Sequence, residues 1–197
     1  SFDDSKILSK VPDDSVDLVI TSPPYGDSRT TVAYGQFSRV SLQWCDFDSF
    51  SYKQIIDIDK TLMGGTQYKK GFENSLCSPV LRKALEEVCE TEENLERAGD
   101  VYSFYKDLQD ILQTVTKKCR QNSYQFWVVG NRTVKGVNLK TDEILVELGK
   151  NLSLTHVMTM DRNISNKVMP SLNSPTNETG KKVKTMCEEL IVVLRKE

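Results

Sequence analysis

The sequence of 197 residues predicts an α/β fold in which short strands alternate with helices. Four short runs rich in β-branched, aromatic and other apolar residues predict strands at 16–20, 124–129, 154–160 and 190–194. Between the first two strands, residues 101–119 repeat apolar side chains every three or four positions, which is typical of an amphipathic helix. No helix separates the last two strands, so we expect them to pair antiparallel.

The remaining elements follow from their end signals. The first strand, "VDLVI", and the last, "LIVVL", are nearly continuous apolar runs, which favours helices on both faces of the sheet. Ser78 as N-cap and Pro79 at the first helical position predict a helix that ends near Arg97. Asp100 is placed to cap helix 101–119, and "TDE" begins a helix over 141–150. Residues 45–99 interrupt the alternation and are interpreted as an insertion, which is either a structural elaboration or an element that recognises a partner or the target sequence.

Composition excludes several classes of protein. The net charge is −2, and no apolar run approaches the roughly 20 residues of a membrane helix. The N-terminal residues do not have the pattern of a signal peptide, and we expect a cytoplasmic protein with no membrane partner. The five cysteines form no Cys-x-x-Cys pair, so we expect reduced thiols and no metal site. His156 is the single histidine, and its place in "LTHVMTM" favours a structural role.

Charge is distributed unevenly along the chain. Residues 117–140 carry six basic and no acidic side chains, and 162–184 are basic again. Either segment is compatible with a solvated surface, but two of them in one half of the chain favour a face that binds a polyanion.

The first strand ends in "TSPPYGDSR", residues 21–29, which is stiffer and more polar than an ordinary turn requires. Pro23 and Pro24 fix φ and lack N–H donors, so the backbone carbonyls here remain available as acceptors. Ser22 adds a hydroxyl, and Tyr25 adds a flat aromatic face. At the carboxyl end of a strand, where α/β sheets bind ligands, this combination suits a planar base with an exocyclic amino group.

An apolar strand followed by Ser/Asp/Asn-Pro-Pro-Tyr/Phe resembles the catalytic signature of the DNA amino-methyltransferases. The approach "LSKVPDDSVDLVITSPPYGDS" is similar to the family over its whole length, and "FWVVGNR", "NKVMPSLNSPTN" and "TMCEELIVVLRK" resemble later segments. The resemblance covers most of 1–44 and 100–197, and covers 45–99 weakly or not at all. It implies a Rossmann-like methyltransferase sheet and a site-specific enzyme of a prokaryotic restriction–modification system.

The resemblance also implies the roles of the motif residues. Ser22 and the carbonyl of Pro23 would hold the amino group of a base flipped out of double-stranded DNA, with Pro24 fixing the backbone and Tyr25 stacking on the base. S-adenosylmethionine would donate the methyl group directly, and Thr21, Ser22 and Pro23 would touch this cofactor. Serine at the first position favours cytosine N4 as the acceptor, with adenine N6 as the alternative.

The Gly-rich turn that holds the cofactor in this family is missing from the sequence. "MGGT", residues 63–66, follows no predicted strand and lacks the spacing. The chain is therefore interpreted as the catalytic half of the domain, containing its fourth to seventh strands, with the cofactor half upstream or in a separate polypeptide. We expect the fourth strand to leave an open sheet edge, which the missing half or a second copy in a homodimer would cover.

Polar residues outside the motif are candidates for DNA contact. Asp27 and Arg29 are candidates to order the loop over the base, and Arg29 and Arg39 to meet phosphates. Asn131 and Arg132 would either line the pocket or cap the next turn. The predicted DNA-contacting set is Arg29, Arg39, Asn131, Arg132, Lys167, Asn173, Thr176 and Asn177. Trp44 and Trp127 are assigned to the core.

Two other functions remain open. A non-catalytic DNA-binding or specificity subunit is favoured by the missing cofactor turn and opposed by the intact Ser22–Tyr25 motif. An RNA or protein amide methyltransferase is opposed by Ser22, because its motif usually begins with asparagine.

Overall fold

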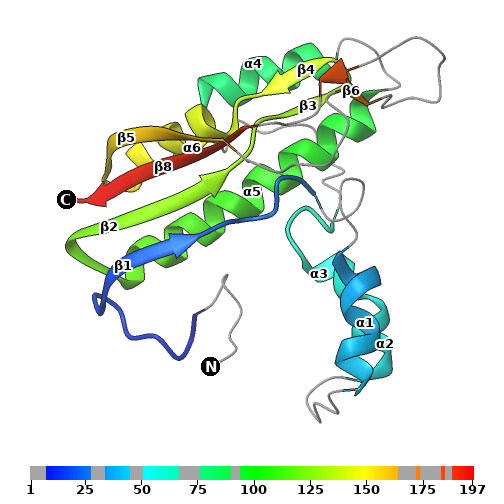
Figure 1. Ribbon diagram of the computed structural model, residues 1–197, viewed down its shortest axis with the longest axis horizontal. Helices are drawn as coiled ribbons and strands as arrows, with labels where there is room; N and C mark the ends of the chain where they lie inside the picture. The colour runs from blue at the N-terminus through cyan, green and yellow to red at the C-terminus, as the bar shows by residue number, and fades with distance from the viewer. Residues whose placement is uncertain are drawn as a thin grey trace.

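The computed structural model describes residues 8–27, 34–44, 51–66, 76–89, 94–163, 172–173, 183–184 and 188–197. Its centre is a four-stranded sheet in the order β1-β2-β8-β5. The bounds are Val16–Thr21 for β1, Cys119–Val129 for β2, Glu188–Lys196 for β8 and Leu154–Asn163 for β5. β1 and β2 are parallel, whereas β8 runs antiparallel to β2 and β5 (Figure 1). The predicted α/β class and the antiparallel pairing of the last two strands are confirmed.

Two helices cover one face of this sheet, α5 (Leu95–Lys118) and α6 (Thr141–Lys150), and α4 (Pro79–Val88) packs against both of them. Figure 1 shows α5 running along β1 and β2 while α6 lies by β5 and β8. The core forms between them, because alternate side chains of the strands meet the apolar stripes of the helices. Its fully buried members include Leu108, Leu112, Trp127, Leu145, Val192 and Leu194.

The opposite face of the sheet is uncovered in the described part of the chain. Leu18 and Ile20 are 54% and 72% exposed, and Met158 and Met160 on β5 are also exposed. The prediction of helices on both faces is thus met on one face only among the described residues. An apolar run shows that side chains on both sides of a strand are apolar, but it does not identify what covers them.

The outer edge of β1 is likewise unpaired among the described residues. β1 is thus an edge strand that packs on one face and is exposed on the other, and β5 forms the opposite edge of the sheet.

The predicted helices exist, but two of their boundaries were wrong. Ser78 caps α4 as expected and accepts a hydrogen bond from the Leu81 N–H at 3.1 Å, yet α4 ends at Val88 rather than near Arg97. α5 begins at Leu95, so Asp100 is not its cap but a buried residue of its second turn. There the carboxylate lies 3.4 Å from Arg97, and this pairing allows the helix to continue through Asp100.

Several short elements were not predicted. Helices α1 (Tyr34–Trp44), α2 (Tyr52–Ile56) and α3 (Ile58–Thr61) contact one another and lie beyond the carboxyl end of β1 (Figure 1). Two small hairpins join β3 (Arg132–Val134) to β4 (Val137–Leu139) and β6 (Leu172–Asn173) to β7 (Val183–Lys184). Apart from α1, which has 11 residues, these elements carry too few residues for a periodic signal.

The two tryptophans have opposite environments. Trp127 is 1% exposed, which confirms the prediction, whereas Trp44 is 86% exposed and the core assignment was wrong. Trp44 is the last residue of α1, whose described contacts are with the other short helices rather than with the sheet.

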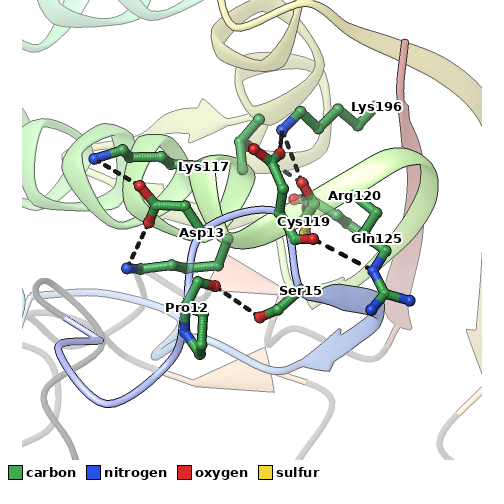
Figure 2. Close-up of polar contacts among 11 residues, drawn as sticks. Pro12, Asp13, Ser15, Lys117, Cys119, Arg120, Gln125 and Lys196 are labelled. Carbon is green, nitrogen blue, oxygen red and sulfur yellow. Dashed lines mark hydrogen bonds and ion pairs between the residues drawn. The ribbon is translucent and has the colours of Figure 1, made fainter.

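The amino end of the sheet is held by a polar cluster (Figure 2). Asp13 lies between Lys117 and Lys118 at 3.0 and 2.7 Å, and these two lysines hold the pKa of its carboxyl below its usual value. Ser15 donates a hydrogen bond to the Pro12 carbonyl, and Lys196 of β8 donates one to the Cys119 carbonyl. These contacts fix the segment before β1 against the α5–β2 junction.

Among the described helices, none is long and apolar enough to cross a membrane. The longest, α5, carries charged residues throughout.

The two tryptophans provide a test of this fold. In Trp44→Phe the remaining emission should be blue-shifted and resistant to acrylamide, because Trp127 is buried. In Trp127→Phe the remaining emission should be red-shifted and readily quenched. Equal quenching of the two variants, with circular dichroism showing both folded, would contradict the described packing.

Candidate active site

The motif loop begins where β1 ends, at Thr21, and reaches Asp27. Because β8 is antiparallel to β2, the start of β8 lies at the same edge of the sheet as the ends of β1 and β2. The Tyr25 hydroxyl donates a hydrogen bond to Glu189 Oε1 at 2.5 Å. The other carboxylate oxygen of Glu189 lies 3.2 Å from Arg162, its cross-strand neighbour on β5. The loop is thereby connected to two further strands.

The environment of Tyr25 keeps its phenol neutral. Burial raises its pKa above the usual value, and the hydrogen bond to Glu189 raises it further. A hydrogen-bonding interaction with the Ser22 side chain acts in the opposite direction. At physiological pH the side chain is therefore an uncharged aromatic ring with a hydroxyl held at one end.

Asp27 anchors the other end of the motif loop. Its side chain is fully buried, and its carboxylate lies 3.3 Å from Arg97 of α5 and 3.1 Å from Arg132 of β3. The Arg132 guanidinium also lies 5.5 Å from the centroid of the Phe104 ring. Burial lowers the pKa of Arg132, while Asp27 opposes that effect. One buried carboxylate thus joins the loop to two elements on different sides of the site.

The turn that follows α3 packs directly against Asp27. Gly64 has φ +66°, and a Cβ at this position would lie 2.5 Å from Asp27 Cβ. Its N–H donates a hydrogen bond to Asp107 Oδ2 at 2.9 Å. A Cβ on Gly65 would lie 2.2 Å from the Asp59 carbonyl oxygen. The glycines of "MGGT" are therefore required by close packing.

An apolar groove of about 400 Å³ opens beside the motif. Thr21, Ser22, Pro23 and Pro24 form one side of it, and apolar residues of β1 and α5 form much of the remainder. The three residues predicted to touch the cofactor are thus together at the mouth of one groove, on the α5 side of β1.

Asn131 and Arg132 are engaged inside the protein. Asn131 donates to Asp142 Oδ1 at 2.9 Å and accepts from the Asp142 N–H at 3.4 Å, so it caps α6. The Arg132 side chain is 10% exposed and is directed at Asp27. Both side chains thus bond within the protein, and their DNA contacts stay a prediction.

The other predicted DNA contacts are distributed as follows. Arg39 lies on α1 and forms an ion pair with Asp59 of α3 at 3.0 Å. Asn173 lies in the short strand β6. The rest fall outside the described residues; they are Arg29, Lys167, Thr176 and Asn177.

Sequence reasoning missed the partners of the motif. Glu189, Arg162 and Arg97 are distant from residues 21–27 in the chain and were not singled out. The one available signal was the acidic "EE" directly before the last apolar strand, which places a carboxylate at the edge of the sheet where the motif lies.

Other candidate chemistry is limited. Among the residues that the structure describes, no group of three metal-ligating side chains comes together. Cys77, Cys89 and Cys119 are free thiols, and burial raises the pKa of the latter two. His156 is exposed, and its Nε2 lies 2.9 Å from Thr159 Oγ1 on the same strand.

Comparison with known proteins agrees with the motif. No protein-family model matches the chain. The chain is 42% identical over 194 residues to Type II methyltransferase M.MvaI of Kocuria varians. It is similar to part of a methyltransferase. The matched region is 96% of this chain and 42% of that protein, so the chain spans less than half of the relative's length. The resemblance to methyltransferases expected from residues 21–25 is confirmed.

Solved structures show a weaker likeness. TTHA0409 of Thermus thermophilus, a "Putative DNA Modification Methylase", matches at a TM-score of 0.47 and 15% identity, covering 98% of this chain and 52% of that one. Its complex with S-adenosyl-L-methionine matches at a TM-score of 0.45 and 15% identity with the same coverage. This degree of likeness adds nothing to the assignment of function.

The Asp27 cluster predicts a large effect on stability. Asp27→Asn should reduce the free energy of unfolding by about 3 kcal/mol, because two guanidinium groups lose a buried counter-charge. Asp17→Asn, which removes an exposed partner of Arg120, should cost less than about 1 kcal/mol. Urea unfolding measures both values, and equal values would contradict the role of Asp27.

Two glycines with positive φ form a matched pair. Gly64→Ala should destabilise the protein by about 1–3 kcal/mol, since strain is combined with the clash against Asp27. Gly136→Ala, at φ +85° but with no atom within 4 Å of the added Cβ, should cost only the backbone strain of about 1 kcal/mol. Thermal or urea unfolding measures the stability of both variants. A larger loss of stability in Gly136→Ala than in Gly64→Ala would contradict the described packing at Gly64.

Proposed function

We propose that the chain is the catalytic half of a site-specific DNA methyltransferase that modifies the exocyclic amino group of a flipped base, with cytosine N4 as the acceptor. The observation that carries this proposal is the Ser22–Tyr25 motif, anchored at both ends on the edge of the sheet, in a chain 42% identical to a Type II methyltransferase. We further propose a role in a restriction–modification system of the prokaryotic cytoplasm, which the resemblance of the Ser22–Tyr25 motif implies.

Different residues of the motif bind and orient the base. The prolines hold the backbone so that the Pro23 carbonyl and the Ser22 hydroxyl accept hydrogen bonds from the amino group. The neutral ring of Tyr25 stacks on the flipped base. The same acceptors would stabilise the positive charge that develops on the amino nitrogen. S-adenosylmethionine, when bound, would supply the methyl group directly from its sulfonium, without a covalent enzyme intermediate.

The described residues provide only one side of a cofactor site. Thr21, Ser22 and Pro23 line the groove beside β1, whereas a Gly-rich turn directly after a strand does not occur among the described elements. We therefore assign the remainder of the cofactor site to another half, upstream or in a separate polypeptide. The open edge of β1 and the exposed Leu18 and Ile20 support a docking position there, since an unpaired edge beside an apolar face favours association.

A non-catalytic DNA-binding subunit is the second candidate. The incomplete cofactor site favours it, because a subunit that only presents the base pocket needs no cofactor turn. An adenine-N6 methyltransferase differs from the first proposal only in the acceptor base, and the modified nucleoside distinguishes them.

Calorimetry and product analysis test the proposal. The isolated chain should bind S-adenosylmethionine weakly or not at all. Combined with its cofactor half, it should methylate double-stranded DNA, and mass spectrometry of the nucleosides should identify N4-methylcytosine. If the mixture binds S-adenosylmethionine but leaves every nucleoside unmodified, the chain is better explained as a non-catalytic DNA-binding subunit. Detection of N6-methyladenine would show that the acceptor is adenine rather than cytosine.

Substitutions of Tyr25 test the stacking role. Tyr25→Ala should lower kcat/KM of the combined enzyme by about ten- to a hundredfold, the effect of losing one base–aromatic stack. Tyr25→Phe retains the ring and should lose less. Equal losses in the two variants, measured by methyl transfer to DNA, would show that the ring does not stack on the base.

A further inference from the structure

We propose that Glu189 is a positioning residue that fixes the orientation of the Tyr25 side chain and the direction of its hydrogen bonds. The inference rests on the proposed function, in which Tyr25 contacts the base. It extends the site to a strand that the motif itself does not include.

Rigidity of the motif backbone does not fix the Tyr25 ring. Pro23 and Pro24 restrict the backbone, but the two side-chain torsions of Tyr25 remain free unless a contact holds them. The contact that the structure provides is the 2.5 Å hydrogen bond from the hydroxyl to Glu189 Oε1. Because a ring that stacks on a base must present its face at one angle, this bond at the far end of the ring is well placed to set that angle.

Glu189 is itself held firmly. It lies on β8, which is paired on both sides, with Arg162 of β5 directly opposite it and Leu190 paired to Val129 of β2. Its side chain is 14% exposed, and Arg162 Nη1 lies 3.2 Å from the carboxylate oxygen that Tyr25 leaves unused. Both oxygens are thus engaged, so the carboxylate is fixed in position and in rotation.

The carboxylate also determines the direction of the hydrogen bonds. An ionised carboxylate only accepts, so the single proton of the Tyr25 hydroxyl is directed to Glu189. Glu189 therefore fixes both the position of the Tyr25 hydroxyl and the direction in which it donates its hydrogen bond.

Arg162 contributes less than Glu189 in this arrangement. Its side chain is 58% exposed, and water replaces an exposed guanidinium at small cost. Arg162→Gln should therefore have a weaker effect than Glu189→Gln.

The first experiment needs no enzymatic activity. The chain carries seven tyrosines, and Cζ-labelled tyrosine gives one carbon-13 signal for each, with Tyr25→Phe assigning that of Tyr25. At neutral pH, Glu189→Gln should move the Tyr25 signal, because the charged acceptor is lost. Glu143→Gln is the matched control: it also removes one glutamate charge, from an exposed pair with Lys140 at 2.7 Å, and should leave the Tyr25 signal in place.

The second experiment uses the enzyme combined with its cofactor half. Glu189→Gln should lower kcat about tenfold, the ratio expected for losing a hydrogen bond to a charged group, with little change in KM for DNA. Glu189→Asp retains an acceptor-only group and should recover part of the loss. In the Tyr25→Phe background, Glu189→Gln should cause no further loss, because the hydroxyl is already absent.

The outcomes separate the two hypotheses. An unmoved Tyr25 signal in folded Glu189→Gln overturns the inference, and so does an unchanged kcat or an additive loss in the double variant. The inference is supported if Glu189→Gln moves the Tyr25 carbon-13 signal and lowers kcat, and if that loss of kcat disappears in the Tyr25→Phe background. If the wild-type enzyme transfers no methyl group, the proposed function fails, while the carbon-13 signal still decides whether Glu189 holds Tyr25.

Discussion

The buried Asp27 carboxylate is the contact on which the geometry of the motif loop depends. Its two guanidinium partners come from α5 and β3, and Gly64 closes over its Cβ, so three separate segments meet at one side chain. A buried charge is costly unless it is paired, and here the pairing dictates where each segment lies. The loop that presents Ser22 and Tyr25 is therefore fixed at its carboxyl end by electrostatics and at its amino end by the ladder of β1.

The two sides of β1 differ in a way that fits an incomplete domain. Toward β2 the strand is paired and packed on α5, whereas its outer edge and the face carrying Leu18 and Ile20 are open among the described residues. The groove beside the motif lies on the α5 side of the same strand and is also largely apolar. The described chain thus offers apolar surface beside the motif, where the proposed function puts the cofactor and the missing half.

The charges of the site are used mainly for internal organisation. Arg132 and Asn131 were predicted from their position at a strand end, and they do lie at that end, but they bind Asp27 and Asp142. Sequence position predicts which residues gather at the edge of a sheet, because parallel strands align their carboxyl ends. It does not predict which of them face one another, since that depends on side-chain packing across elements. Glu189 illustrates the same point, because its partner Tyr25 is 164 residues away.

Local patterns in the sequence determined the four strands, the helices α4 and α6, the body of α5 and the motif at the end of β1, because these depend on periodicity, caps and proline geometry within a few residues. The continuation of α5 through Asp100, the break after Val88 and the exposed Trp44 depended on tertiary contacts, and the sequence alone predicted them wrongly. The same holds for the partners of Tyr25 and Asp27. These contacts join distant segments, and only the packing of α5 and β8 against the motif loop decides them.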